Sequence, residues 1–470
     1  MNSAIPRATA RTARQPEFGL NDELLSLRPK AVWKAFFAEH FAFIAIAVYL
    51  LLEYLKLDQS YPIFSILPLI RLSLIAAIIG YFADKQAKFV RSPLNWLLVL
   101  FLLHCAASSA LAYQPAYSFE RFSVIGTWVI VYFLVTGIVS TERRLFLFVL
   151  IYFLANFKMS QFGFFSWVSR GFGFASWGIT GAGWFRNSGE LGLEMSMFFA
   201  FTVCLAFHLR KYWHGWVKWL MYFMPVTALA CVIASSSRGA IVGVVGVVFY
   251  LSFFSKRKLR AWTASAVLLF LAYLMMPAQF LERFQKAGND PTSLTRIEYW
   301  TRAWELLQQN PYFGIGYYNW LPYYRDHFFN PSLYWRVEEA HNTYLQMGAE
   351  LGYIGLAIFV CMVAVSFRIN WKSASLCKEE GMDFLRGWAL GMNAAGLGMI
   401  LASVFLTAFF MPNYWIHFAF TVCLSNVVQK KIQAKHVAAS GRGMPVASRG
   451  SAAKNAKPAP ATSRAPRISA

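Results

Sequence analysis

The sequence predicts an all-α polytopic membrane protein with about twelve transmembrane helices and one large, partly helical loop on the non-cytoplasmic side. Hydrophobic residues make up 57% of the 470 residues and charged residues only 14%, whereas a soluble domain carries roughly a quarter charged residues. Apolar runs of about twenty residues recur from Ala35 to Val428, and each is long enough to cross a hydrocarbon core. These runs must be helical, because lipid offers no partner for open backbone groups.

The apolar runs also divide the chain into regions. Residues 1–34 are basic and mostly polar without the apolar core of a signal peptide, so we expect a cytoplasmic N-terminal leader. We expect transmembrane helices one to nine within 35–276, the large outer loop at 277–342, and helices ten to twelve within 343–428. Residues 429–470 are mostly Ala, Ser, Lys, Arg, Pro and Gly, which predicts a basic, disordered cytoplasmic tail. The expected spans are 35–55, 62–82, 94–112, 121–139, 143–157, 191–208, 219–234, 239–254, 262–276, 343–367, 387–410 and 412–428.

The distribution of Lys and Arg predicts the orientation of the helices. With the N-terminus in the cytoplasm, Lys and Arg cluster in the short loops that fall inside, whereas the short outer loops hold only Lys56, Arg121 and Arg238. We therefore expect both termini in the cytoplasm and the loop 277–342 outside. The net charge of +22 follows this loop and tail pattern, so it indicates topology and contact with the lipid bilayer, with no nucleic acid as a partner.

Two segments between the spans carry structural signals of their own. Residues 158–190 are rich in Gly, Phe and Trp, which suits an interfacial or re-entrant segment. In the large loop, Asp290-Pro291 is typical of a helix cap followed by proline, and it predicts a helix over about Thr292–Gln309. The apolar residues that would share one face of this helix are Ile297, Trp300, Trp304 and Leu307.

The most specific chemical signal lies where the large loop enters the tenth helix. Glu338-Glu339-Ala340-His341-Asn342 is followed by Gly352-Tyr353-Ile354-Gly355-Leu356. The glycines, with Gly348, would give a smooth surface for close helix approach. His341 would lie at a helix start near the membrane surface, where a neutral imidazole can accept a proton from a sugar hydroxyl. The alternative is an interfacial histidine with no chemical role.

Two arginines are the candidate ligands for an anion. Arg238, in Ser235-Ser236-Ser237-Arg238-Gly239-Ala240, lies at the apex of a tight outer connection, where arginine is normally avoided. Its guanidinium either clamps phosphate oxygens or touches lipid headgroups from the interface. Arg296 lies on the expected loop helix, with Arg302 after it; the alternative there is a solvated face on which Arg302 pairs with Glu298.

Other signals limit the chemistry. The six cysteines include no C-x-x-C pair and no metal-ligand spacing, so we expect neither disulfides nor zinc. No D-x-D, P-loop or Gly-rich dinucleotide motif occurs, which leaves a metal-bound nucleotide-sugar donor unsupported, and we expect no cofactor. Glu350 falls two turns inside the tenth helix, where an acid is expected to face the helix bundle rather than lipid.

These motifs resemble the O-antigen ligase family, which also includes O-antigen and exopolysaccharide polymerases and protein O-oligosaccharyltransferases. The H-N-x9-G-x-x-G-L pattern at His341–Leu356 looks like the family's most typical element. Ser236-Ser237-Arg238-Gly239 is similar to its outer-facing S-R-G element, and Arg296 through Gly316 to its R-W-N-P-G-x-G stretch. The resemblance covers about residues 185–428, and the twelve helices and large loop also fit it.

The resemblance implies a metal-independent glycosyltransferase of the bacterial inner membrane. Its donor would be an undecaprenyl-diphosphate-linked glycan used at the periplasmic face, and its acceptor a saccharide, either lipid A-core or a growing polysaccharide. Arg238 and Arg296 would bind the donor diphosphate, and His341 would be the catalytic residue that acts on the acceptor hydroxyl. The resemblance does not separate a ligase from a polymerase. Residues expected to support this site are Arg186, Arg302, Glu339, Asn342 and Glu350.

A transporter or flippase for a polysaccharide or a lipid-linked precursor is the alternative function. It would explain the helices and the intramembrane charges. It would not explain a long, partly helical outer loop joined to the His341 motif, and the sequence shows no clear internal repeat of the kind found in many transporters.

Overall fold

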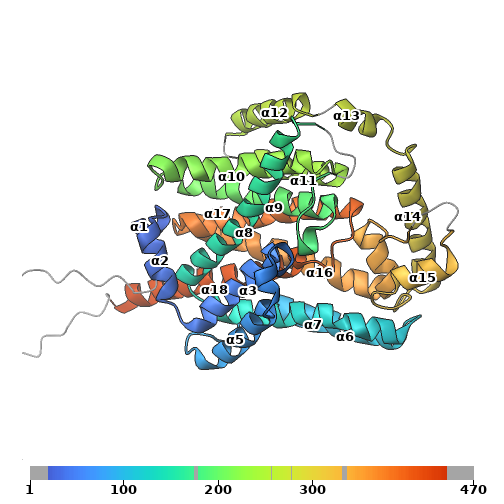
Figure 1. The fold of residues 1–470 in the computed structure, drawn as a ribbon. Helices are drawn as coiled ribbons and strands as arrows, with labels where there is room; N and C mark the ends of the chain where they lie inside the picture. Colours follow the sequence, from blue (N-terminus) through green and yellow to red (C-terminus); the bar gives the residue numbers. More distant parts are fainter. Residues whose placement is uncertain (1–19, 174–177, 256, 277, 331–335, 442–470) are drawn as a thin grey trace, which may run out of the picture. The chain divides into compact units, whose positions relative to one another are not determined.

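The computed structural model describes residues 20–173, 178–255, 257–276, 278–330 and 336–441, and within them every regular element is a helix (Figure 1). Residues up to Gln429 form one unit, and the residues from Lys430 onward form a second. The α-helices are α1 (Asp22–Leu25), α2 (Pro29–Phe37), α3 (Phe41–Leu55), α4 (Leu57–Ser60), α5 (Leu69–Ala83), α6 (Pro93–Ala110), α7 (Pro115–Ile138), α8 (Glu142–Ser169), α9 (Ser188–Leu209), α10 (Gly215–Ala234), α11 (Arg238–Phe253), α12 (Lys258–Leu274), α13 (Ala278–Gln285), α14 (Pro291–Gln309), α15 (Trp320–His327), α16 (Thr343–Glu379), α17 (Asp383–Ala402) and α18 (Pro412–Gly441). Short 3-10 helices are η1 (Pro62–Ser65), η2 (Gly183–Phe185) and η3 (Ser403–Phe405).

Several of these helices are long and apolar enough to cross a membrane, which confirms the all-helical membrane class. Within the described residues there are seven such helices, or eight if α2 and α3 count as one bent span. The expected count of about twelve is therefore not confirmed. Helices α5 and α11 have 15 and 16 residues, and 16 residues rise only about 24 Å, less than a hydrocarbon core of about 30 Å. The expected spans 262–276 and 412–428 fall in α12 and α18, which are not among the seven.

Two segments differ from what the sequence predicted. Residues 158–169 continue α8 as regular helix, so only the later part of 158–190 forms an irregular connection, with η2 inside it. The interpretation of the aromatic residues there as interfacial stays a prediction: Phe162 and Phe165 on α8 are exposed, whereas Trp167 is buried. Residues 429–441 are helical because α18 runs on to Gly441, although a disordered tail was expected from 429; the rest of that tail lies outside the described residues.

Close approach of small residues builds the centre of the helical bundle. Helix α9 packs on α10, α11 and α17, and α16 packs on α6 and α17 (Figure 1). Between α11 and α17, a Cβ on Gly243 would lie 2.9 Å from the carbonyl oxygen of Gly398, so the two backbones touch. Contacts of this kind drive helix association where lipid removes the ordinary hydrophobic effect.

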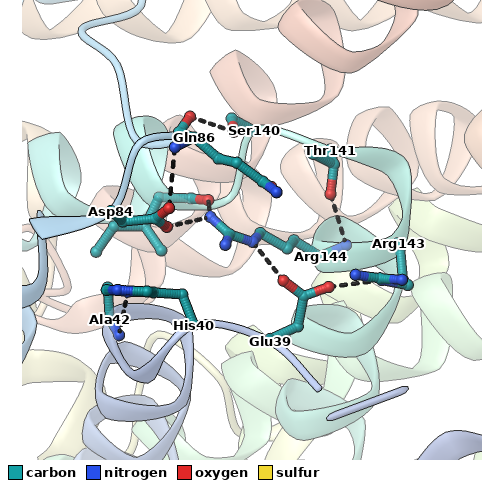
Figure 2. Close-up of polar contacts among 10 residues, drawn as sticks. Glu39, His40, Ala42, Asp84, Gln86, Ser140, Thr141, Arg143 and Arg144 are labelled. Carbon is teal, nitrogen blue, oxygen red and sulfur yellow. Dashed lines mark hydrogen bonds and ion pairs between the residues drawn. The ribbon is translucent and has the colours of Figure 1, made fainter. Parts of the chain in front are cut away.

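A buried ion network joins α8 to the segments that end α2 and α5 (Figure 2). Arg144 is 1% exposed, and it donates to Glu39 Oε2 at 2.7 Å and to Asp84 Oδ2 at 2.6 Å. The neighbouring Arg143 donates to Glu39 Oε1 at 2.5 Å. Glu39 lies at the break between α2 and α3, whose axes bend by 116°. The network therefore fixes the direction in which α2 leaves the bundle.

Gly352 interrupts α16 and lets the outer loop dock on it. Its φ of +68° is in the left-handed region that glycine adopts readily, and the break frees carbonyl groups of the preceding turn. The backbone N–H of Ile315 donates to Ala349 O at 2.8 Å, and that of Gly316 to Glu350 O at 3.1 Å. Glycine here was expected to give a smooth helix surface, but its larger effect is this docking site.

Candidate active site

One cavity collects side chains from five separate parts of the chain. Its volume is about 1130 Å³, and its walls come from the segment before α9 with the first turn of α9, the α10–α11 turn, helices α13 and α14, the loop before α16, and the residues Phe405 and Leu406 that follow α17. It brings together all three residues that the sequence singled out for chemistry, Arg238, Arg296 and His341. The other charged residues in its walls are Arg186, Glu190, Glu282, Lys286, Asp290, Arg336 and Glu338.

Arg238 is the first residue of α11 and reaches the loop helix. Ser237 caps α11 by accepting a hydrogen bond from the backbone of Ala240. The Arg238 side chain, directly after this cap, lines the cavity. Its Nη1 donates to Asp290 Oδ2 at 3.1 Å, and its Nη2 donates to Ser293 Oγ at 3.0 Å. The apolar helix α11 is thereby bonded to the N-terminus of α14.

Arg296 is carried by α14, which begins with Asp290 as its cap and Pro291 at its first position, as the sequence predicted. The buried face of α14 is formed by Tyr299, Ala303, Leu306 and Leu307. Of the four apolar residues expected to share one face, Leu307 belongs to it, whereas Ile297 and Trp304 are exposed. The helical rotation is set by packing onto Ile315, Trp320 and Tyr324 of the same outer loop, and it leaves Arg296 facing the cavity.

The loop that carries His341 is held rigidly on both sides of the histidine. The indole of Trp320 donates to the Glu338 carbonyl at 3.0 Å, and that of Trp300 to the Ala340 carbonyl at 3.0 Å. The Ala340 N–H donates to Gln346 Oε1 at 2.8 Å. His341 has a φ of +52°, a conformation that costs a non-glycine residue energy and persists only where the surroundings enforce it.

His341 forms a pair with Glu338 inside the cavity wall. Its Nε2 lies 3.3 Å from Glu338 Oε2, and its side chain is 12% exposed. Burial lowers the pKa of His341 below its usual value, and the Arg296 charge lowers it further, against the opposing bond to Glu338. The His341 hydrogen bond, with that of Arg336, lowers the pKa of Glu338 to about 2. At neutral pH the pair is therefore a neutral imidazole beside a carboxylate.

Only one of the five expected supporting residues lines the cavity. Arg186 does, and its Nη2 donates to Gln59 Oε1 at 3.1 Å. Asn342 caps α16, accepting from the backbone of Tyr344 and Leu345. Arg302 pairs with Glu305 at 2.9 Å on the loop helix, outside the described lining.

Glu339 and Glu350 are not among the described residues that line the cavity, and each accepts hydrogen bonds from its neighbours. Burial raises the pKa of Glu339 to about 7, and its carboxylate accepts a hydrogen bond from Gln346. Glu350 is buried, as expected for an acid facing the bundle, and accepts from the backbone N–H groups of Tyr318 and Trp320. It thus fixes the turn that follows the docked glycine segment.

Two residues that contact the predicted ones, Glu338 and Asp290, were not predicted from the sequence as part of the site. Glu338 was quoted in the motif, but Glu339 was chosen as the supporting acid, although Glu338 lies three residues before His341 and bonds to it. Asp290 was interpreted only as a helix cap, yet its second carboxylate oxygen bonds Arg238. No local pattern connects these two residues, because they lie 52 positions apart.

Arg238, Arg296 and His341 all lie within one region of the chain that matches a known family. Residues 223–360 match the family model of O-antigen ligase. The chain carries an O-antigen ligase family domain. No curated protein matches the chain. With the apolar helices, this O-antigen ligase domain identifies a multi-pass bacterial membrane protein that processes glycans in the manner of a ligase or polymerase.

Proposed function

We propose that the protein is a glycosyltransferase that moves a glycan from an undecaprenyl-diphosphate carrier to a saccharide hydroxyl at the periplasmic face of the inner membrane. The observation that carries the proposal is the shared cavity of Arg238, Arg296 and His341, all within the O-antigen ligase domain. Two guanidinium groups suit a diphosphate, because charge-assisted, bidentate contacts to phosphate oxygens are strong and directional.

The chemistry assigned to the cavity is a displacement at the anomeric carbon of the donor sugar. The acceptor oxygen forms the new glycosidic bond while the bond from the anomeric carbon to the diphosphate oxygen breaks. The hydroxyl proton passes to His341, and the diphosphate leaves on its lipid carrier. Arg238 and Arg296 offset the negative charge that develops on the leaving diphosphate. No metal or nucleotide has a role in this proposal.

The sugar polymer and its acceptor define two versions of the proposal. A ligase would transfer a finished polysaccharide to lipid A-core. A polymerase would join one lipid-linked glycan to another, so that the polysaccharide grows on the same kind of carrier. The 1130 Å³ cavity, with both cationic and anionic walls, is compatible with either acceptor. The transporter alternative would require a path for the substrate through the helical bundle.

Transfer by the purified protein is the direct test. The full chain in lipid nanodiscs would receive an undecaprenyl-diphosphate-linked glycan, with either lipid A-core or a second lipid-linked glycan as acceptor. We expect a longer or transferred glycan and released undecaprenyl diphosphate. Movement of the donor across a vesicle membrane without any new glycosidic bond would instead support the transporter alternative.

A further inference from the structure

We infer that Glu338 is a positioning residue that holds the imidazole of His341 in one tautomer, so that Nδ1 of His341 takes the proton from the hydroxyl of the acceptor saccharide. This inference rests on the proposed function and adds the atom that receives the proton and a residue that controls it. It follows from the contacts of Glu338, the two nitrogens of His341 and the rigidity of their loop.

The first step is the direction of the hydrogen bond between the two side chains. Glu338 also accepts from Arg336, whose Nε lies 2.6 Å from Glu338 Oε1. The carboxylate is ionised at neutral pH and can only accept. His341 Nε2, 3.3 Å from Glu338 Oε2, must therefore be the donor.

The other ring nitrogen of His341, Nδ1, carries the lone pair. A neutral imidazole carries one N–H and one lone pair, so a proton on Nε2 leaves the lone pair on Nδ1. Among the described residues Nδ1 has no hydrogen-bond partner, and His341 lines the cavity. When Nδ1 takes the hydroxyl proton, the imidazolium that forms remains bonded to the Glu338 carboxylate, which stabilises its charge.

The surroundings of His341 also keep its imidazole in this orientation and tautomer. The two indole bonds to the Glu338 and Ala340 carbonyls fix the backbone on either side. The charged groups that act on His341 are Glu338 and Arg336 from its own loop and Arg296 from α14. Of these only Glu338 can accept a hydrogen bond from the ring.

Replacing Glu338 by glutamine tests this role. Glu338→Gln removes the charge and keeps the size, so we expect kcat to fall at least about tenfold, though not below that of His341→Ala, while donor binding stays unchanged. Because Glu338 opposes the other effects on the pKa of His341, its loss should move the acidic limb of the pH–rate profile to lower pH. Glu338→Asp keeps the charge but shortens the side chain, so it should lower kcat and shift that limb to lower pH by less than Glu338→Gln does, because the charge of the carboxylate remains when the hydrogen bond is lost.

Glu305→Gln is the matched control, because Glu305 pairs with Arg302 outside the described lining of the cavity. Thermal unfolding of each variant would show that it folds. Wild-type kcat and pH profile in Glu338→Gln, or a loss of donor binding alone, would overturn the inference while the proposed function stands. If the wild-type chain and Glu305→Gln transfer no glycan, the proposed function fails and this inference with it.

Discussion

Arg238 donates a hydrogen bond to Asp290 across 52 positions of sequence, at 3.1 Å. The same carboxylate accepts from the hydroxyl of Ser293, and its other oxygen accepts the backbone N–H that caps α14. One acid therefore orders the loop helix that bears Arg296 and also occupies the guanidinium assigned to the donor. A diphosphate that binds Arg238 must compete with Asp290.

Neutralising Asp290 should strengthen donor binding. Asp290→Asn keeps a good helix cap, since asparagine caps as well as aspartate, but removes the competing charge. The pair is partly exposed, so we expect the dissociation constant of the lipid-linked donor to fall by only about two- to fivefold. Titration of the donor into the protein in nanodiscs measures this. Asp383→Asn, which removes a partner of Lys211, is the control; weaker binding in Asp290→Asn would contradict competition.

We expect that lysine cannot take over the contacts of either arginine with the donor diphosphate. A lysine ammonium is a point charge, whereas a guanidinium can make two parallel hydrogen bonds to phosphate oxygens. We expect Arg238→Lys and Arg296→Lys each to weaken donor binding by about tenfold or more, which corresponds to roughly 1.4 kcal/mol. Arg302→Lys, outside the described lining, should bind donor normally. Normal donor binding in both site variants would show that the diphosphate does not bind to these arginines in the cavity.

The sequence singled out Arg238, Arg296 and His341 because each lies in a local pattern, and the structure brings them to one cavity, whereas their chemical roles stay a prediction. His341 stands before the tenth expected helix, Arg238 at a tight turn and Arg296 on a capped helix. The contacts among them were beyond the sequence, because the α14 rotation and the docking at Gly352 depend on tertiary packing. The expected helix count is not confirmed for a different reason: hydropathy measures apolar length, whereas the apolar helices α5 and α11 end after 15 and 16 residues.

Breaking the buried ion network should destabilise the protein. Arg144→Gln would leave Glu39 and Asp84 without their main cation inside the bundle, and removal of one partner from a buried ion pair typically costs about 3–5 kcal/mol. Lys211→Gln is a matched control, because the Lys211–Asp383 pair is largely exposed and should contribute less than about 1 kcal/mol. Thermal unfolding in one detergent compares them. Equal unfolding temperatures would show that the network contributes little.

The outer loop should be accessible only from the periplasm. Ala287 and Glu379 are both exposed in the structure and fall on opposite sides of the expected topology. A membrane-impermeant maleimide applied to intact spheroplasts should label Ala287→Cys and spare Glu379→Cys until the membrane is opened. Five of the six native cysteines are buried. Cys361 is exposed but lies within α16, one of the helices long and apolar enough to cross the membrane, so the variant Cys361→Ser is the background for both labelling variants. The reverse labelling pattern would invert the topology.

His341 should be required for transfer, whereas the other histidine of the outer loop should not. His327 stacks on Tyr323, with ring centroids 4.1 Å apart, and its Nδ1 donates to the Tyr323 carbonyl at 3.0 Å. It is not among the described residues that line the cavity. His327→Ala should therefore keep most activity, while His341→Ala should lose about a hundredfold to ten-thousandfold in kcat, the usual contribution of a general base.

The pH dependence of transfer distinguishes a base from a phosphate ligand. Burial and Arg296 lower the pKa of His341, so its neutral, proton-accepting form persists at neutral pH and below the ordinary histidine value. Activity should fall only as the pH drops through this lowered pKa, because protonation removes the lone pair. A ligand for the diphosphate would behave in the opposite way, since a protonated imidazole binds phosphate better. Near-normal turnover of His341→Ala with weakened donor binding would thus reassign the residue, and full activity of both histidine variants would remove catalysis from this loop.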